Sequence, residues 1–127
     1  MPLADVTRAA NSSLEFAGMI TGALFTDFNN DKKPDLIICG EWTAVRFFKN
    51  EDNKLVEVTN STGLSGMNGL WRSLQQADID KDGDMDYIAG NLGTNTLNRA
   101  SDEFPVTVYA KDFNNDGNFD AIPTVFY

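Results

Sequence analysis

Short apolar runs alternate along the chain with clusters of Asp, Asn and Gly, and this pattern predicts β-strands joined by turns. The runs are about 5–10 residues long, and the run 54–59 alternates with a period of two. No stretch has the spacing of a convincing amphipathic helix. The expected strands are 3–7, 19–28, 34–39, 44–49, 54–59, 71–79, 86–90, 105–110 and 119–127.

The four runs between 19 and 59 predict one up-and-down antiparallel sheet, with a polar hairpin tip at 50–53. Residues 60–70 hold three glycines and no periodicity, so they predict the connection to a second sheet. We therefore expect an all-β chain of antiparallel, four-stranded, blade-like sheets, as one region from 1 to 127. The first repeat is expected at about 19–60 and the second at about 70–127.

The region from about 104 leaves two alternatives open, because the repeat spacing is uneven. The first two acidic loops start 51 residues apart, and the third starts only 34 residues later. Either the second unit has lost its outer hairpin and a third, partial repeat begins here, or the third loop joins the outer strands of the second sheet. The second alternative, which gives two complete four-stranded sheets, is slightly favoured.

Three loops carry one nine-residue pattern, with carboxylates or amides at positions 1, 3, 5 and 9. A tight loop turns alternate side chains toward one point, where anionic groups repel each other unless a cation lies between them. Hard oxygen ligands in a flexible loop suit Ca²⁺, which takes about 6–8 oxygens. The expected side-chain ligands are Asp27, Asn29, Asp31 and Asp35, then Asp78, Asp80, Asp82 and Asp86, then Asp112, Asn114, Asp116 and Asp120. Position 7 would offer a backbone carbonyl, and it is occupied by Lys33, Asp84 and Asn118.

The three loops together would bind up to three Ca²⁺. The residue at position 6 sets their expected order of calcium affinity. Glycine permits a sharp bend there, and the second and third loops have it. The first loop has Lys32, which would be strained by a left-handed backbone. We expect the second loop to be the strongest site, the third the next, and the first the weakest.

Two other kinds of loop share parts of this pattern. Asp, Asn and Gly clusters also form ordinary turns, but three loops with matching positions favour a metal. An EF-hand needs a bidentate Glu at position 12, where this chain has Ile38, Ala89 and Pro123. The flanks are also expected to be strands, so an EF-hand is disfavoured.

Composition places the negative charge in the loops and excludes several classes of protein. The net charge is −9, which argues against binding nucleic acid or anionic membrane surfaces. The chain has no histidine, so Ser-His-Asp and Cys-His catalysis are absent and a zinc site is disfavoured. Its single cysteine, Cys39, lies in an apolar run and is expected to be a buried small hydrophobe. No signal peptide or transmembrane run is visible, so a leader of an exported parent would be missing here.

The repeated pattern Asp-x-Asp/Asn-x-Asp-Gly-x-x-Asp between apolar strands resembles the FG-GAP/VCBS repeat, the calcium-bearing blade of integrin-α-type β-propellers. Segments 25–29, 35–42 and 90–93 are similar to bacterial extracellular members of this group. The resemblance covers roughly residues 19–127 and implies a partial β-propeller of two to two-and-a-half repeats. It also implies that 3–7 is the last strand of a preceding unit.

The expected function is a calcium-binding repeat module of an extracellular, cell-surface or periplasmic interaction protein, in which calcium is structural and the partner is a protein or glycan. The alternative is an accessory, non-catalytic part of a carbohydrate-active enzyme. No paired carboxylates remain for catalysis, so we do not expect an enzyme. Trp71 would have to be largely exposed to act as a sugar platform. Because a propeller closes with about 4–8 blades, we expect a fragment of a longer chain or self-association.

Overall fold

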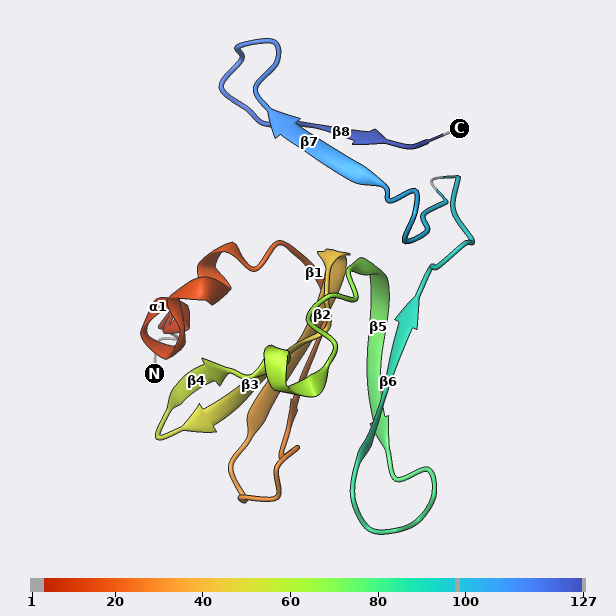
Figure 1. Cartoon of the computed structure of the whole chain (residues 1–127). Coiled ribbons are helices and arrows are strands. Elements are labelled where there is room, and N and C mark those ends of the chain that lie inside the picture. Colours follow the sequence, from red (N-terminus) through yellow and green to blue (C-terminus); the bar gives the residue numbers. More distant parts are fainter. Residues whose placement is uncertain (1–3, 98, 127) are drawn as a thin grey trace. The chain divides into compact units, whose positions relative to one another are not determined.

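The computed structural model describes residues 4–97 and 99–126, and its regular structure is mostly antiparallel β-strand (Figure 1). The strands are β1 (Met19–Thr26), β2 (Asp35–Thr43), β3 (Arg46–Glu51), β4 (Lys54–Glu57), β5 (Gly69–Ala77), β6 (Asp86–Asn91), β7 (Thr107–Lys111) and β8 (Asp120–Thr124). One-turn helices are α1 (Thr7–Ala10), η1 (Ser12–Phe16) and η2 (Thr59–Thr62). The predicted all-β class is confirmed. No helix among the described residues is long and apolar enough to cross a membrane.

The chain divides into two compact units, 1–91 and 92–127. The first unit contains β1 to β6, and the second contains β7 and β8. The expected repeat limits, about 19–60 and 70–127, stay predictions.

Strands β1 to β4 form the predicted up-and-down sheet, in which each strand pairs with the next one along the chain. The central strand β2 pairs with β1 on one side and with β3 at 36–38 on the other. Its far end also pairs with the start of β5, where Glu41 lies opposite Leu70. β5 pairs in turn with β6, so β1 to β6 belong to one six-stranded sheet, in the order β4-β3-β2-β5-β6 with β1 also on β2.

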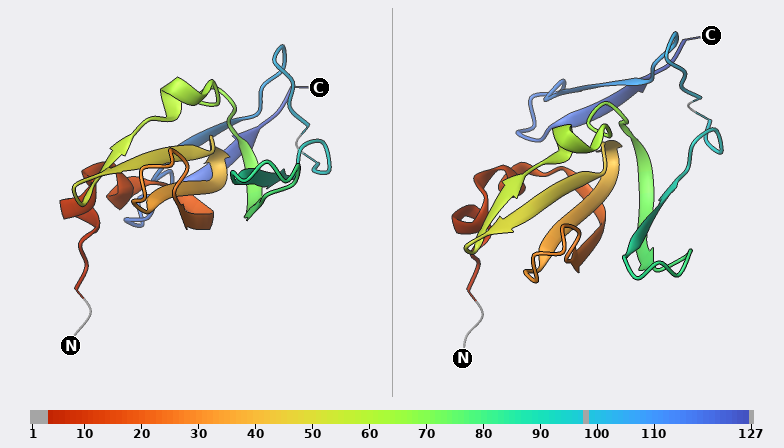
Figure 2. Two further views of the ribbon diagram at one scale, coloured as in Figure 1. Left: turned by 90° about the horizontal axis from the view of Figure 1, so that it is seen from below. Right: turned by 60° about the horizontal axis from the view of Figure 1, so that its bottom comes forward.

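Burial of β2 on both faces explains its continuous apolar run. Ile37 and Cys39 point to one face, where they pack with Val45 and Leu74. Leu36 and Ile38 point to the other face and pack with Phe48. Cys39 is fully buried, as expected of a small hydrophobe. The N-terminal helical turns and the connection after β4 lie on opposite sides of this sheet (Figure 2).

The N-terminal segment differs from its prediction as a strand at 3–7. Residues 4–6 have no regular structure, α1 begins at Thr7, and Leu3 lies outside the described residues. The cause is local hydrogen bonding, because the Asp5 carboxylate accepts the Thr7 N–H at 2.9 Å in a turn just before α1. The Asn11 side chain accepts the Ser13 N–H and caps η1. This segment therefore does not supply the last strand of a preceding blade.

The second unit is a two-stranded hairpin. β7 and β8 pair from Thr107 opposite Thr124 to Lys111 opposite Asp120. Among the described residues these two strands pair only with each other. The two alternatives for the region from about 104, a third partial repeat or the outer strands of a second sheet, stay predictions.

Candidate metal centre

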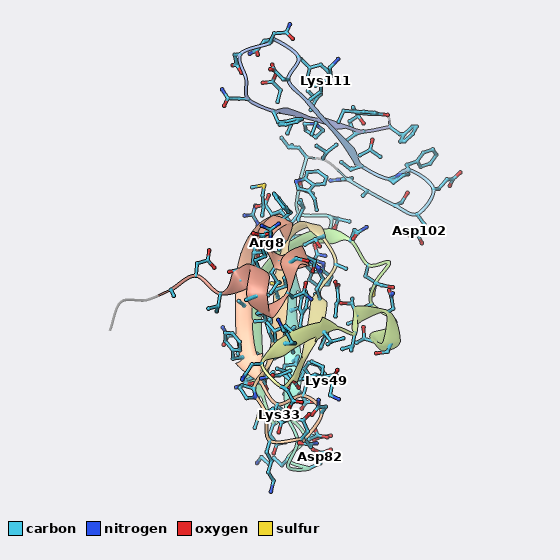
Figure 3. All side chains as sticks on the ribbon, turned by 90° about the vertical axis from the view of Figure 1, so that its left-hand side faces the viewer. Arg8, Lys33, Lys49, Asp82, Asp102 and Lys111 are labelled. Carbon is cyan, nitrogen blue, oxygen red and sulfur yellow. The ribbon has the colours of Figure 1, made fainter. Side chains whose placement is uncertain are left out.

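Each acidic loop connects the two strands of a hairpin. Position 1 directly follows β1, β5 or β7, and position 9 is the first residue of β2, β6 or β8. The flanks are therefore strands, which agrees with the argument against an EF-hand. Within unit 1–91 the first two loops lie at the same end of their hairpins (Figure 1), and Figure 3 shows Lys33 of the first loop and Asp82 of the second at this end.

The three loops share one backbone conformation, with two residues in the left-handed region. Position 4 has a φ of 60° at Asn30, 64° at Lys81 and 59° at Asn115. Position 6 has a φ of 67° at Lys32, 98° at Gly83 and 88° at Gly117. The predicted strain at Lys32 is therefore present, because left-handed backbone disfavours residues with a Cβ.

Backbone amides hold the carboxylates in the same places in all three loops. In the first loop Asp27 accepts the Lys32 N–H at 2.7 Å, and Asp31 accepts the Lys33 N–H at 3.0 Å. The other two loops repeat both bonds, and position 3 accepts the N–H of position 5 throughout. Position 9 accepts the N–H of position 2 in every loop. The side chains at positions 1, 3, 5 and 9 therefore accept backbone N–H groups of their own loop in all three cases.

The second loop brings three carboxylates into one cluster. One oxygen each of Asp78, Asp80 and Asp86 lies within 4.8 Å of the others. Asp78 Oδ1 is buried and has no hydrogen-bond partner. A buried carboxylate oxygen without a donor is costly, and a cation in the cluster would satisfy it. This all-oxygen set fits Ca²⁺, which favours hard ligands.

Neighbouring carboxylates in the second loop also perturb each other. The Asp84 N–H donates to Asp82 and lowers the pKa of Asp82. The Asp82 carboxylate in turn raises the pKa of Asp84. Both side chains are exposed, so solvent and salt screen their repulsion. A cation bound nearby would reduce this repulsion further.

The first loop is anchored to the tip of the β3–β4 hairpin. Asp35 is fully buried, and its Oδ1 accepts the Asn50 N–H at 2.7 Å. Lys33 Nζ lies 3.0 Å from Asp52 Oδ1, and this carboxylate raises the pKa of Lys33. Sequence reasoning missed these contacts, because residues 15 to 19 positions apart meet only once the hairpin is folded.

The third loop, in unit 92–127, repeats the geometry with fewer charges. Asp112 accepts the N–H groups of Asp116 and Gly117 at 3.1 and 2.9 Å. The Asn118 N–H donates to Asp116 and lowers the pKa of Asp116. The side chain of Asn114 donates to Asp116 at 3.0 Å, so the expected ligands at positions 3 and 5 are in contact.

Trp71 does not meet the condition for a sugar platform, which was a largely exposed ring. It is partly buried, packs against the core cluster and donates its indole N–H to Met67 O at 3.2 Å. It also lines an apolar cavity of about 210 Å³ with Phe47 and Tyr87. Trp42 is 40% exposed and occupies a bulge between β2 and β5, with a φ of 63°.

Comparison with known families agrees with this geometry. Residues 27–89, which include the first two loops, β2 to β5 and the first part of β6, match the family described as FG-GAP-like repeat. The chain carries an FG-GAP-like repeat. Such repeats are generally non-catalytic modules of interaction proteins, and this chain contains a module of that kind. No curated protein and no solved structure matches the chain significantly.

Proposed function

We propose that this FG-GAP-like repeat chain binds Ca²⁺ in its acidic loops and that the metal is structural. The observation that carries the proposal is the buried, partnerless Oδ1 of Asp78 beside the carboxylates of Asp80 and Asp86. Asp78, Asp80, Asp82 and Asp86 would hold the ion in the second loop, with the matching residues of the other loops as further sites. The bound ion would offset carboxylate repulsion and fix the ends of β5 and β6.

The module belongs, on this proposal, to an extracellular, cell-surface or periplasmic protein that binds a protein or glycan. Loops with this ligand set are suited to compartments in which free calcium is abundant. A net charge of −9 disfavours nucleic acid and anionic lipid as partners. Exposed apolar side chains such as Phe25, Ile88 and Met19 support contact with further polypeptide, either more of a longer chain or a second copy.

Thermal unfolding in EDTA and in calcium tests the proposal. Calcium binds the folded loops and not the unfolded chain, so it stabilises the fold by about 2.7 kcal/mol at one hundred times its Kd. For a unit of this size, we expect Tm to rise by roughly 10 °C, as measured by circular dichroism. An equal concentration of Mg²⁺ should have a smaller effect, because Mg²⁺ dehydrates reluctantly and demands octahedral geometry.

The matched variants are Asp80→Ala and Asp102→Ala. Both remove one exposed carboxylate, but only Asp80 belongs to the cluster. Asp80→Ala should lose most of the calcium-induced rise in Tm, whereas Asp102→Ala should keep it. An unchanged Tm for the parent chain in saturating calcium would contradict structural calcium binding.

A further inference from the structure

The first two acidic loops share a backbone but hold their last carboxylate differently. Asp35 is fully buried and accepts two N–H groups, from Asn50 at 2.7 Å and from Phe28 at 3.3 Å. Its counterpart Asp86 is partly buried and, within the described chain, accepts only the Ile79 N–H, at 2.8 Å. The first loop thus receives from β3 a donor that the second loop does not have.

The tip of the β3–β4 hairpin makes two further contacts with the first loop. The Asn50 side chain donates to Pro34 O at 3.0 Å, and Asp52 pairs with Lys33 at 3.0 Å. We call these contacts, together with the Asn50–Asp35 bond, the hairpin clamp. Its donors all come from the protein, so they need no metal to form.

The two loops also differ at position 1 and in charge. Both oxygens of Asp27 accept N–H groups, from Asp31 at 3.0 Å and Lys32 at 2.7 Å. Asp78 has one buried oxygen without a partner. The first loop holds three carboxylates and two lysines, whereas the second holds five carboxylates and one lysine. Repulsion among carboxylates is therefore much better offset in the first loop before any ion binds.

We infer that calcium orders unit 1–91 through the second loop, while the hairpin clamp holds the first loop in shape without metal. The inference rests on the proposed calcium binding, and it assigns different roles to the two loops of unit 1–91. Both loops share the N–H of position 2, from Phe28 or Ile79, so the additional donor in the first loop is the Asn50 N–H. It supplies to Asp35 the positive partial charge that a cation would supply to Asp86. The first loop then serves as a permanent support of β2, and within unit 1–91 it is the second loop that calcium orders.

Amide hydrogen exchange by NMR on the full chain, in EDTA and in saturating Ca²⁺, tests the inference. The first loop is read at the amides of Asp31, Lys32 and Asn50, and the second at those of Ile79 and Gly83. We expect the first set to be protected in EDTA and to change less than twofold with calcium. The second set should become at least tenfold slower on calcium binding.

The variants Asp52→Asn and Glu51→Gln provide a matched pair at the hairpin tip. Both remove one negative charge, but only Asp52 contacts the first loop, whereas Glu51 pairs with Lys49. An exposed ion pair corresponds to a change of up to about fivefold in local opening. In EDTA, Asp52→Asn should therefore speed exchange at Asp31 and Lys32 by about two- to fivefold, and Glu51→Gln should leave it unchanged.

The outcomes separate the two proposals. First-loop amides that exchange freely in EDTA and gain protection with calcium in parallel with the second loop would overturn the clamp. Protected first-loop amides with no calcium response in either loop would overturn calcium binding and leave the clamp standing. Protection of the first loop in EDTA together with a calcium response confined to the second loop supports both.

Discussion

Lys32 occupies a backbone conformation that its two counterparts fill with glycine. Its φ is 67°, and position 6 of the other loops is Gly83 and Gly117. A left-handed residue with a Cβ costs about 1–2 kcal/mol relative to a relaxed conformation. Part of this cost is offset in the unfolded chain, because lysine has less backbone freedom to lose than glycine.

Replacing this lysine should therefore stabilise the protein. Lys32→Gly removes the left-handed strain, but glycine gives the unfolded chain more backbone entropy, which opposes folding by about 0.5–1 kcal/mol. We expect the free energy of unfolding to rise by a net amount of about 1 kcal/mol. Chemical denaturation in EDTA measures this gain as a higher midpoint with an unchanged m-value.

Gly83→Ala is the opposite control for Lys32→Gly. A Cβ at Gly83 would meet nothing within 4 Å, so only its φ of 98° opposes the change. We expect Gly83→Ala to lower stability by about 1 kcal/mol. A loss of stability in Lys32→Gly would show that the lysine side chain contributes more than its backbone strain costs.

Local chemistry explains which residues of the site could be predicted. Asp and Asn side chains bond backbone N–H groups two to five residues away, so the inward-facing positions are encoded within each loop. The burial of Asp35 could not be predicted in this way, because Asn50 reaches it from the next hairpin. The strain at Lys32 was predictable from the glycine pattern alone.

The Arg46–Glu57 ion pair connects strands β3 and β4 with neighbouring segments of the chain. Two guanidinium nitrogens of Arg46 donate to the two carboxylate oxygens of Glu57, at 2.9 and 2.8 Å. Arg46 also donates to Ser13 of η1, and Thr59 of η2 donates to Glu57. The pair therefore joins β3, β4, η1 and η2.

This pair makes stability depend on pH in the acid range. The Arg46 bond lowers the pKa of Glu57 below its unfolded value of about 4.3. A lowered folded pKa means that the stabilisation is fully present above the unfolded value and is lost as pH falls through the folded one. The Glu57 side chain is 35% exposed, so solvent screening limits the contribution to about 1 kcal/mol or less.

Glu57→Gln isolates this contribution. Denaturation in EDTA at pH 7 and at pH 3 gives a stability difference for each protein. The acidic loops titrate equally in both, so the parent should lose more stability than Glu57→Gln by up to about 1 kcal/mol. Equal losses in the two proteins would show that the pair is too well solvated to matter.

Apolar runs and turn residues were enough to predict β1 to β4, because β2 is apolar on both faces and polar turns separate the strands. The ends differ by up to four residues; β3 starts at Arg46 and not at Ala44, and β2 ends at Thr43 and not at Cys39. The N-terminal turns were missed because Asp5 bonds the Thr7 N–H in a local turn and Asn11 caps η1, and both bonds compete with a short apolar pattern. The arrangement of β7 and β8 was not encoded by spacing, since both alternatives used the same two strands.

At the scale of the whole molecule, the two units differ in their core. Unit 1–91 has two clusters of buried apolar residues around β2. In unit 92–127 no described side chain is buried, and the Phe104–Phe126 contact, with ring centroids 5.7 Å apart, is its described aromatic pair. An isolated two-stranded hairpin is at best marginally stable in water.

Separate fragments should therefore behave differently. We expect 1–91 to unfold cooperatively and to keep the calcium response of the second loop, because both clusters lie within it. We expect 92–127 to give a narrow, unfolded NMR spectrum in EDTA, because a hairpin without buried side chains cannot offset the entropy of ordering its chain. Circular dichroism melts and ¹⁵N-correlation spectra of the two fragments check this.

Adding calcium to the 92–127 fragment tests whether metal binding can order a hairpin that has no buried core. The third loop has glycine at position 6 and three aspartates, so the ion can bind it without backbone strain. If saturating calcium disperses the spectrum, metal binding supplies the ordering free energy that the missing core does not. A dispersed spectrum already in EDTA would contradict the argument, since it would mean that this hairpin folds without either a core or a metal.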